Sequence, residues 1–192
     1  MNRKAKLRSP SDVRRHFAGN DVPIWHLCQT NYYLMGVQDW VRDWRFVHVN
    51  DPYDGGPPHV LVPARAGEIE WTSLVDLNNQ MLRLDEVRAA IQAAGPGGRV
   101  VLFDFDAETE ALCRELGLDL LFPGSALRNS VGNKITATRL ATSVDVACVP
   151  NIIANIPDYQ TLRRLAGHLG ERLVVQAAHG DSGMTTWFVA SE

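Results

Sequence analysis

The residue types best suited to binding a phosphate group lie together at 180–186, in the segment GDSGMTT. Gly180 and Gly183 allow the backbone to approach a ligand closely and to point its N–H groups toward it. The hydroxyl side chains of the segment are those of Ser182, Thr185 and Thr186. The segment is not a Walker A loop, because Met184 stands where that motif could place its lysine and a strand-forming run follows instead of a helix.

The sequence on either side of this loop is typical of two strands. An apolar run at 173–175 precedes the loop, and β-branched and aromatic residues at 185–189 follow it. Two such runs separated by a glycine-containing turn predict a strand, a loop and a second strand. Before the first strand, the apolar spacing of 159–169 predicts a helix with Asp158 as its N-cap.

Four segments of the chain, in this order, resemble the ATP-grasp ligases and, among them, the biotin-carboxylase-like branch. They are GNKITATRLA at 132–141, VPN at 149–151, YQTLRRLAGHLGERLVVQ at 159–176 and GDSGMTT at 180–186. In that family a lysine at the position of Lys134 contacts nucleotide phosphate. The resemblance therefore implies ATP as the ligand, bound by Lys134, Gln176, Gly180, Asp181, Ser182, Gly183, Thr185 and Thr186.

The chain departs from the family pattern in two ways. Gln176 stands where a second lysine normally contacts phosphate and adenine, and its amide lacks the charge-assisted strength of an ammonium. The family's acidic Mg²⁺ ligands and catalytic groups follow the hairpin, whereas this sequence ends at Glu192. We therefore expect the N-terminal portion of an ATP-dependent carboxylate ligase. It binds ATP phosphates, is not catalytic alone, and binds Mg²⁺ only when a C-terminal half completes it.

Two other interpretations stay open. The chain is alternatively a non-catalytic binding or scaffold protein derived from such a ligase. In that case it pairs with a separate chain that carries the C-terminal half, or it forms a homodimer. A third interpretation is a generic α/β domain in which the glycine-rich segment only turns a hairpin. No residue is assigned a catalytic role under any of the three.

The first part of the chain has the pattern of an α/β sheet. Apolar and β-branched runs predict strands at 22–29, 46–50, 59–63, near 69–72, at 99–105 and at 118–123. Helical spacing predicts helices at 37–44, 84–94 and 106–116, with Asp106 as the N-cap of the last. Strands that alternate with helices through short links predict a mostly parallel, Rossmann-like sheet wrapped by helices.

Three parts of the chain follow from these patterns. The first is a basic N-terminal segment at 1–20, which we expect to be solvated and partly frayed. The resemblance identifies 21–124 as the pre-ATP-grasp α/β domain of the family. It identifies 125–192 as an incomplete, α+β first ATP-grasp subdomain that carries the glycine-rich hairpin. Within it, 124–132 is expected to be a connection, and Lys134 to lie in the first turn of a short helix.

Composition excludes several classes of function. The chain of 192 residues is 45% hydrophobic and 21% charged, with a formal net charge of −3, which argues against nucleic acid as a partner. The cysteines at 28, 113 and 148 and the six histidines show no metal-ligand spacing, so the sequence predicts no metal site. No apolar stretch approaches the ~20 residues that cross a bilayer, and no signal peptide is evident. We expect a cytoplasmic protein with no membrane partner.

Overall fold

The computed structural model describes residues 6–30, 34, 36–50, 58–180 and 182–190. The chain divides into two compact units, Met1–Ser125 and Ala126–Glu192. The family domains assigned above to 21–124 and 125–192 stay predictions. Within the described ranges, no helix has both the length and the apolar character needed to cross a membrane.

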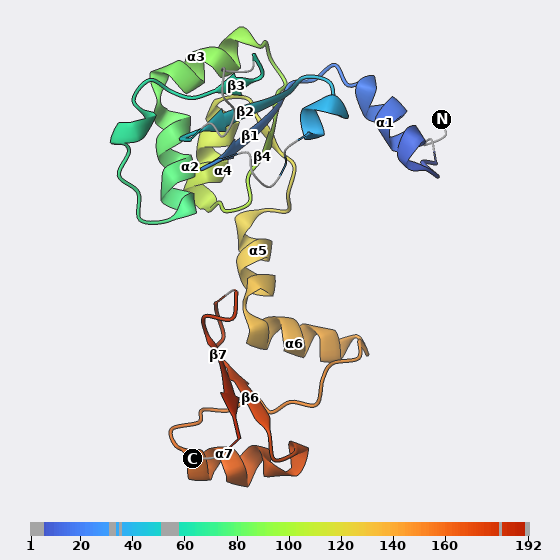
Figure 1. Ribbon diagram of the computed structural model, residues 1–192, viewed down its shortest axis with the longest axis vertical. Helices are drawn as coiled ribbons and strands as arrows, with labels where there is room; N and C mark the ends of the chain where they lie inside the picture. The colour runs from blue at the N-terminus through green and yellow to red at the C-terminus, as the bar shows by residue number, and fades with distance from the viewer. Residues whose placement is uncertain (1–5, 31–33, 35, 51–57, 181, 191–192) are drawn as a thin grey trace. The chain divides into compact units, whose positions relative to one another are not determined.

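The first unit is built on a five-stranded sheet with the strand order β3-β2-β1-β4-β5 (Figure 1). All four strand pairings are parallel. The strands are β1 (Ile24–Cys28), β2 (Trp44–His48), β3 (Val60–Leu61), β4 (Arg99–Val101) and β5 (Asp119–Leu120). The central strand β1 is buried from Ile24 to Leu27, as expected for a parallel strand covered on both faces. The predicted α/β class with a parallel sheet is therefore confirmed.

Three α-helices pack on one face of this sheet (Figure 1). They are α2 (Leu74–Arg83), α3 (Asp85–Ala93) and α4 (Ala107–Glu115). The core between helices and sheet contains Trp25 and Leu27 of β1, Met81 of α2 and Ile91 of α3, each at most 3% exposed. Successive side chains of a strand point to opposite faces of the sheet. Since Trp25 and Leu27 face the helices, Ile24, His26 and Cys28 face the other side of the sheet.

That other face carries a separate buried cluster to which, among the described residues, no α-helix contributes. Its apolar members are Ile24, Val41, Trp44, Phe46 and Val101, with Leu34, Val37 and Val60 packed against them. The same face holds two fully buried histidines, His26 and His48. Burial, and then the proximity of His48, lowers the pKa of His26 to about 3. Burial, and then the proximity of His59, lowers the pKa of His48 to about 4, so both rings are neutral.

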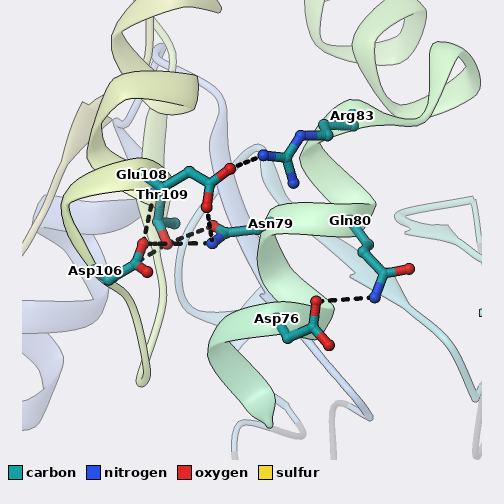
Figure 2. Close-up of polar contacts among 7 residues, drawn as sticks. All are labelled: Asp76, Asn79, Gln80, Arg83, Asp106, Glu108 and Thr109. Carbon is teal, nitrogen blue, oxygen red and sulfur yellow. Dashed lines mark hydrogen bonds and ion pairs between the residues drawn. The ribbon is translucent and has the colours of Figure 1, made fainter. Parts of the chain in front are cut away.

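A polar network fastens α2 to the start of α4 (Figure 2). Asn79, on α2, donates to Asp106 Oδ1 at 3.3 Å and to Glu108 Oε2 at 3.5 Å. The hydroxyl of Thr109 donates to Asn79 Oδ1 and accepts from the Asp106 N–H at 3.1 Å. Asp106 in turn caps α4 by accepting from the Thr109 N–H at 2.9 Å, which completes a capping box. An ion pair between Arg83 and Glu108 closes the network on its solvent side.

The second unit contains a two-stranded antiparallel sheet and three α-helices. The strands are β6 (Leu173–Gln176) and β7 (Thr186–Val189). The helices are α6 (Lys134–Ser143), α7 (Tyr159–Ala166) and most of α5 (Ser125–Gly132), whose first residue belongs to the first unit. Asp158 caps α7 by accepting from the Thr161 N–H at 2.7 Å, as predicted. The buried core of this unit is formed by Leu162, Ala166 and Leu173.

Several predicted elements differ from the structure. The predicted helix at 37–44 is wrong. The segment instead contains a short 3-10 helix, η2 (Val37–Asp39), and Trp44 is the first residue of β2. The predicted strand near 69–72 is absent, because 69–73 has no strand partner and leads into α2, which the sequence analysis missed. A second 3-10 helix, η3 (Ala66–Glu68), precedes this segment, and a third, η4 (Gly167–Leu169), follows α7.

Two further helices lie where none was predicted. Segment 124–132 is not a simple connection but contains α5, whose Ser125 N–H donates to the Glu110 carboxylate. Residues 10–18 of the basic segment form α1 (Pro10–Ala18), which buries no residue. The sequence signal for α1 was present, since Ser9 caps it and Pro10 occupies its first turn.

Candidate phosphate-binding hairpin

The glycine-rich segment forms the loop of the hairpin between β6 and β7. The two strands pair from Leu173 with Val189 to Gln176 with Thr186, so the loop starts directly after Gln176. Its backbone departs from the strand conformation at Gly180 (φ +128°), Ser182 (φ +48°) and Gly183 (φ +78°). Positive φ is rare outside glycine, so the two glycines allow this loop shape and Ser182 adopts it at some cost.

Gly180 is also required for space. A Cβ atom at this position would lie 2.1 Å from Thr185 Oγ1. The Thr185 hydroxyl fills that space because it donates to the His179 carbonyl at 2.9 Å. The Thr185 hydroxyl therefore holds the loop closed on itself. At Gly183, by contrast, an added Cβ would meet open space.

Lys134 joins the start of α6 to this loop. Its backbone N–H donates to the Ala178 carbonyl at 2.8 Å, and its ammonium donates to the Gly180 carbonyl. The side chain is half-buried. An ammonium carries three donors, so two remain for a ligand after the bond to Gly180. The structure thus brings together Lys134, Gly180 and Thr185 from segments that are 46 residues apart in sequence.

Asn133 and His179 add contacts that the sequence analysis did not assign. The Asn133 side chain accepts from the Thr136 N–H at 3.0 Å and so caps α6. Its amide nitrogen lies 3.4 Å from His179 Nε2. An asparagine directly before a helix is an N-cap signal, so Asn133 could have been found from the sequence. The positive end of the α6 dipole then lies beside the Lys134 ammonium, and both favour an anion.

The other predicted residues are placed as follows. The Gln176 amide donates to Thr186 Oγ1 at 3.1 Å, so these two side chains form a pair at the end of the sheet. The Thr186 N–H donates to the Gly183 carbonyl at 3.1 Å, which closes the turn. Ser182 is exposed. Asp181 lies outside the described residues. The hydroxyl of Ser182 and the amide of Gln176 are accessible to a ligand, while the Thr185 hydroxyl already bonds within the loop.

Known proteins of similar sequence belong to carboxylases. A pyruvate carboxylase component of Methanothermobacter thermautotrophicus is 26% identical over 106 residues, which are 54% of this chain and 22% of that protein. The alpha component of mitochondrial methylcrotonoyl-CoA carboxylase of Glycine max is 26% identical over 128 residues, 67% of this chain and 16% of that protein. The propionyl-CoA carboxylase alpha chain of Ruegeria pomeroyi is 25% identical over 109 residues. These relatives confirm the predicted resemblance of the chain to the biotin-carboxylase-like branch of the ATP-grasp superfamily.

A solved structure has a fold similar to that of this chain. Pyruvate carboxylase of Rhizobium etli superposes with a TM-score of 0.51 over 90% of the chain, at 17% sequence identity. The superposition covers 16% of that much longer protein. A scan against protein-family models found no match. The chain spans about a fifth of the length of the relatives it matches.

Proposed function

We propose that this chain is the N-terminal portion of an ATP-dependent carboxylate ligase of the ATP-grasp type. In such a reaction the γ-phosphate of ATP passes to a carboxylate, and a nucleophile then displaces the acyl phosphate. The part assigned to this chain is to bind the ATP phosphates with Lys134, Gln176 and the loop at 180–186. Catalysis is assigned to a C-terminal half that follows in the family.

The contact between the Lys134 ammonium and the Gly180 carbonyl carries this proposal. It places a cation with two free donors beside a loop whose glycines let the backbone approach a phosphate. Electrostatic stabilisation of the transferred phosphoryl group requires such preorganised donors, because they need not reorganise during the reaction. Closure of the loop would also exclude water from the phosphates.

Mg²⁺ and partners follow from the same proposal. Mg²⁺ is held by one or two carboxylates together with substrate phosphates, so we assign its protein ligands to the C-terminal half. That half is a further portion of the same protein or a separate chain; a homodimer is the alternative assembly. Two of the relatives are subunits by name, which supports assembly with a partner. We propose a cytoplasmic location for the complex.

A non-catalytic binding or scaffold protein is the second candidate function. Gln176 favours it, because its neutral amide already bonds to Thr186 and brings no charge to the site. Apolar side chains around the hairpin also remain exposed, with Met184 at 80% and Phe188 at 84%. An exposed apolar patch marks a surface for a partner, whether or not ATP is turned over.

Isothermal titration calorimetry of Mg·ATP into the intact chain tests the proposal. Lys134→Ala is expected to raise the Kd by about tenfold or more, because a hydrogen bond to a charged group contributes roughly 1.5–3 kcal/mol. Arg139→Ala is the matched control, since Arg139 is an exposed cation on the same helix and its removal changes the net charge equally. No saturable binding at millimolar ATP, or equal weakening in both variants, would contradict phosphate binding by this hairpin and favour the scaffold.

A further inference from the structure

The first unit contains a second group of side chains able to bind a ligand, at the edge where parallel strands end. Cys28 is the last residue of β1 and His48 is the last residue of β2, and the strand register places the two side by side. His26 lies two residues before Cys28 and so points to the same face of the sheet. One ligand atom from each of the three residues lies within 4.8 Å of the other two.

Local sequence patterns do not reveal this group, because its members come from different strands. His26 and Cys28 are separated by one residue, and this spacing does not match the usual zinc-binding sequence motifs. His48 is twenty positions farther along the chain. Pairing of β1 with β2 in the Cys28–His48 register is what brings it to the other two, and such register is a property of the folded sheet.

Three of the four imidazole nitrogens of this group lack hydrogen-bond partners within the described part of the chain, and the fourth, His26 Nδ1, contacts Cys28 Sγ. Both side chains are fully buried, and His26 Nε2 and the two ring nitrogens of His48 have no partner within the described part of the chain. Leaving a buried polar atom unsatisfied costs about 1–3 kcal/mol. Aromatic rings surround them instead, with Phe46 centred 5.6 Å from His26 and 5.0 Å from His48. Several buried polar atoms without partners at the same place in a structure need an explanation. A bound metal ion would provide one, because it would coordinate these nitrogens.

The separations suit a tetrahedral metal ion. Zn²⁺ binds cysteine sulfur at ~2.3 Å and histidine nitrogen at ~2.0–2.1 Å, so the two atoms lie about 3.6 Å apart around a tetrahedral ion. Cys28 Sγ lies 3.7 Å from His26 Nδ1. All ligand atoms of the group lie within 4.8 Å of one another, so the farthest pair must come closer by side-chain rotation when one ion binds. Mg²⁺ and Ca²⁺ are excluded as preferred ions because they take oxygen ligands.

We propose that His26, Cys28 and His48 bind one Zn²⁺ ion. Three protein ligands leave the fourth tetrahedral position for water or another ligand, the arrangement of zinc sites that keep an open position. The Cys28 thiol, which donates to the Thr30 carbonyl at 2.6 Å, releases its proton when the sulfur coordinates the ion. The site lies in the first unit and does not depend on ATP binding by the hairpin.

Cobalt substitution tests this site with a readout that reports on the sulfur ligand. The intact protein is stripped with a chelator and titrated with Co²⁺, then with Zn²⁺. We expect binding of one ion per chain and a near-ultraviolet thiolate-to-cobalt charge-transfer band, which Zn²⁺ abolishes by displacing Co²⁺. The Cys28→Ser variant is expected to lose the band. Its Kd for Zn²⁺ is expected to rise more than about 100-fold, because loss of a residue that only supports a ligand already costs about 10–100-fold.

A second variant keeps the test decisive if Cys28→Ser does not fold. A chain with both Cys113→Ala and Cys148→Ala retains Cys28 as its single thiol. It is expected to keep the charge-transfer band and the 1:1 stoichiometry. Absence of the band in this chain and in the wild type, or a band that persists in Cys28→Ser, would overturn the proposed site. A His48→Phe chain that still binds Zn²⁺ as tightly as the wild type would do the same.

Discussion

At the residue scale, Gln176 stands where the family resemblance leads us to expect a lysine. The Gln176 amide makes one neutral hydrogen bond, to Thr186 Oγ1, at the end of β6. We expect Gln176→Lys to tighten Mg·ATP binding about fivefold, because a hydrogen bond to a charged group contributes roughly 1 kcal/mol more than a neutral one. Calorimetry measures the Kd directly. Gln176→Met, which keeps the length without a donor, is the control; equal affinities for the Lys and Met variants would show that position 176 does not face the phosphates.

The two loop glycines differ in what surrounds them. Gly180→Ala places a methyl group against Thr185 Oγ1 and breaks the bond from Thr185 to the His179 carbonyl, whereas Gly183→Ala meets open space. Both variants bear the conformational cost of a side chain at positive φ, roughly 1–3 kcal/mol. We therefore expect Gly180→Ala to weaken ATP binding more than Gly183→Ala. The ratio of the two Kd values, from calorimetry, checks this order, and a ratio of one would mean that loop shape at 180 does not control binding.

At the scale of elements, the cap of α4 holds two helices at once. Asp106 accepts from the Thr109 N–H and from the Asn79 side chain on α2. Asp106→Ala is expected to lower the free energy of unfolding by about 1–2 kcal/mol, the range for loss of an N-cap. Asp106→Asn keeps a capping oxygen and is expected to lose less. Urea unfolding of the three chains gives the comparison, and equal losses for Ala and Asn would show that charge, not capping, matters here.

The lowered pKa of Asp106 makes the stability of the protein depend on pH. Burial favours the neutral acid, but hydrogen bonds from Thr109 and Asn79 outweigh it and lower the pKa of Asp106 below 3.8. A carboxyl whose folded pKa is lowered contributes stability that is fully present above its unfolded pKa and is lost as pH falls through the folded pKa. We expect the stability advantage of the wild type over Asp106→Asn to be constant above about pH 5 and to shrink below 3.8. Urea unfolding on either side of this range measures it, and an advantage that grows on acidification would contradict the assigned direction.

Local sequence patterns predicted those elements whose conformation depends on residues close together in the chain. The strand predicted at 99–105 is present over the shorter range 99–101, and the predicted caps at Asp106 and Asp158 are present. The helix expected at 37–44 failed because Val37, Val41 and Trp44 share a helical spacing but pack as a 3-10 turn, a connection and a strand on one buried face. Tertiary packing, not local periodicity, decides their conformation.

The residues of the two candidate sites also differ in whether the sequence could predict them. The turn at Gly180 and Gly183 could be predicted from residue type alone, whereas ligand binding by this loop stays a prediction. The role of Lys134 came from the family resemblance, and the structure then placed its ammonium on the Gly180 carbonyl. The group of His26, Cys28 and His48 could not be predicted, because its three members meet through the pairing of two parallel strands.

At the scale of the whole molecule, the two units differ in how much core they bury. The first unit has two buried clusters, one on each face of its sheet, whereas the described core of the second consists of Leu162, Ala166 and Leu173. Small units bury too little surface to be strongly stable alone. Local opening is easiest where few buried apolar contacts exist, so backbone amides of β6 and β7 are expected to exchange with solvent faster than those of β1 and β4.

The division into units also separates the two proposed ligands in one experiment. Hydrogen exchange followed by mass spectrometry is measured on the free chain, with Mg·ATP, and with Zn²⁺. Since a ligand slows opening of the structure that binds it, Mg·ATP is expected to slow exchange at the start of α6 and in 177–186, whereas Zn²⁺ slows it in β1 and β2. Lys134→Ala should remove the first effect and leave the second, and Cys28→Ser should do the reverse. Protection of the same peptides by both ligands, or loss of both effects in either variant, would mean that one site rather than two accounts for binding.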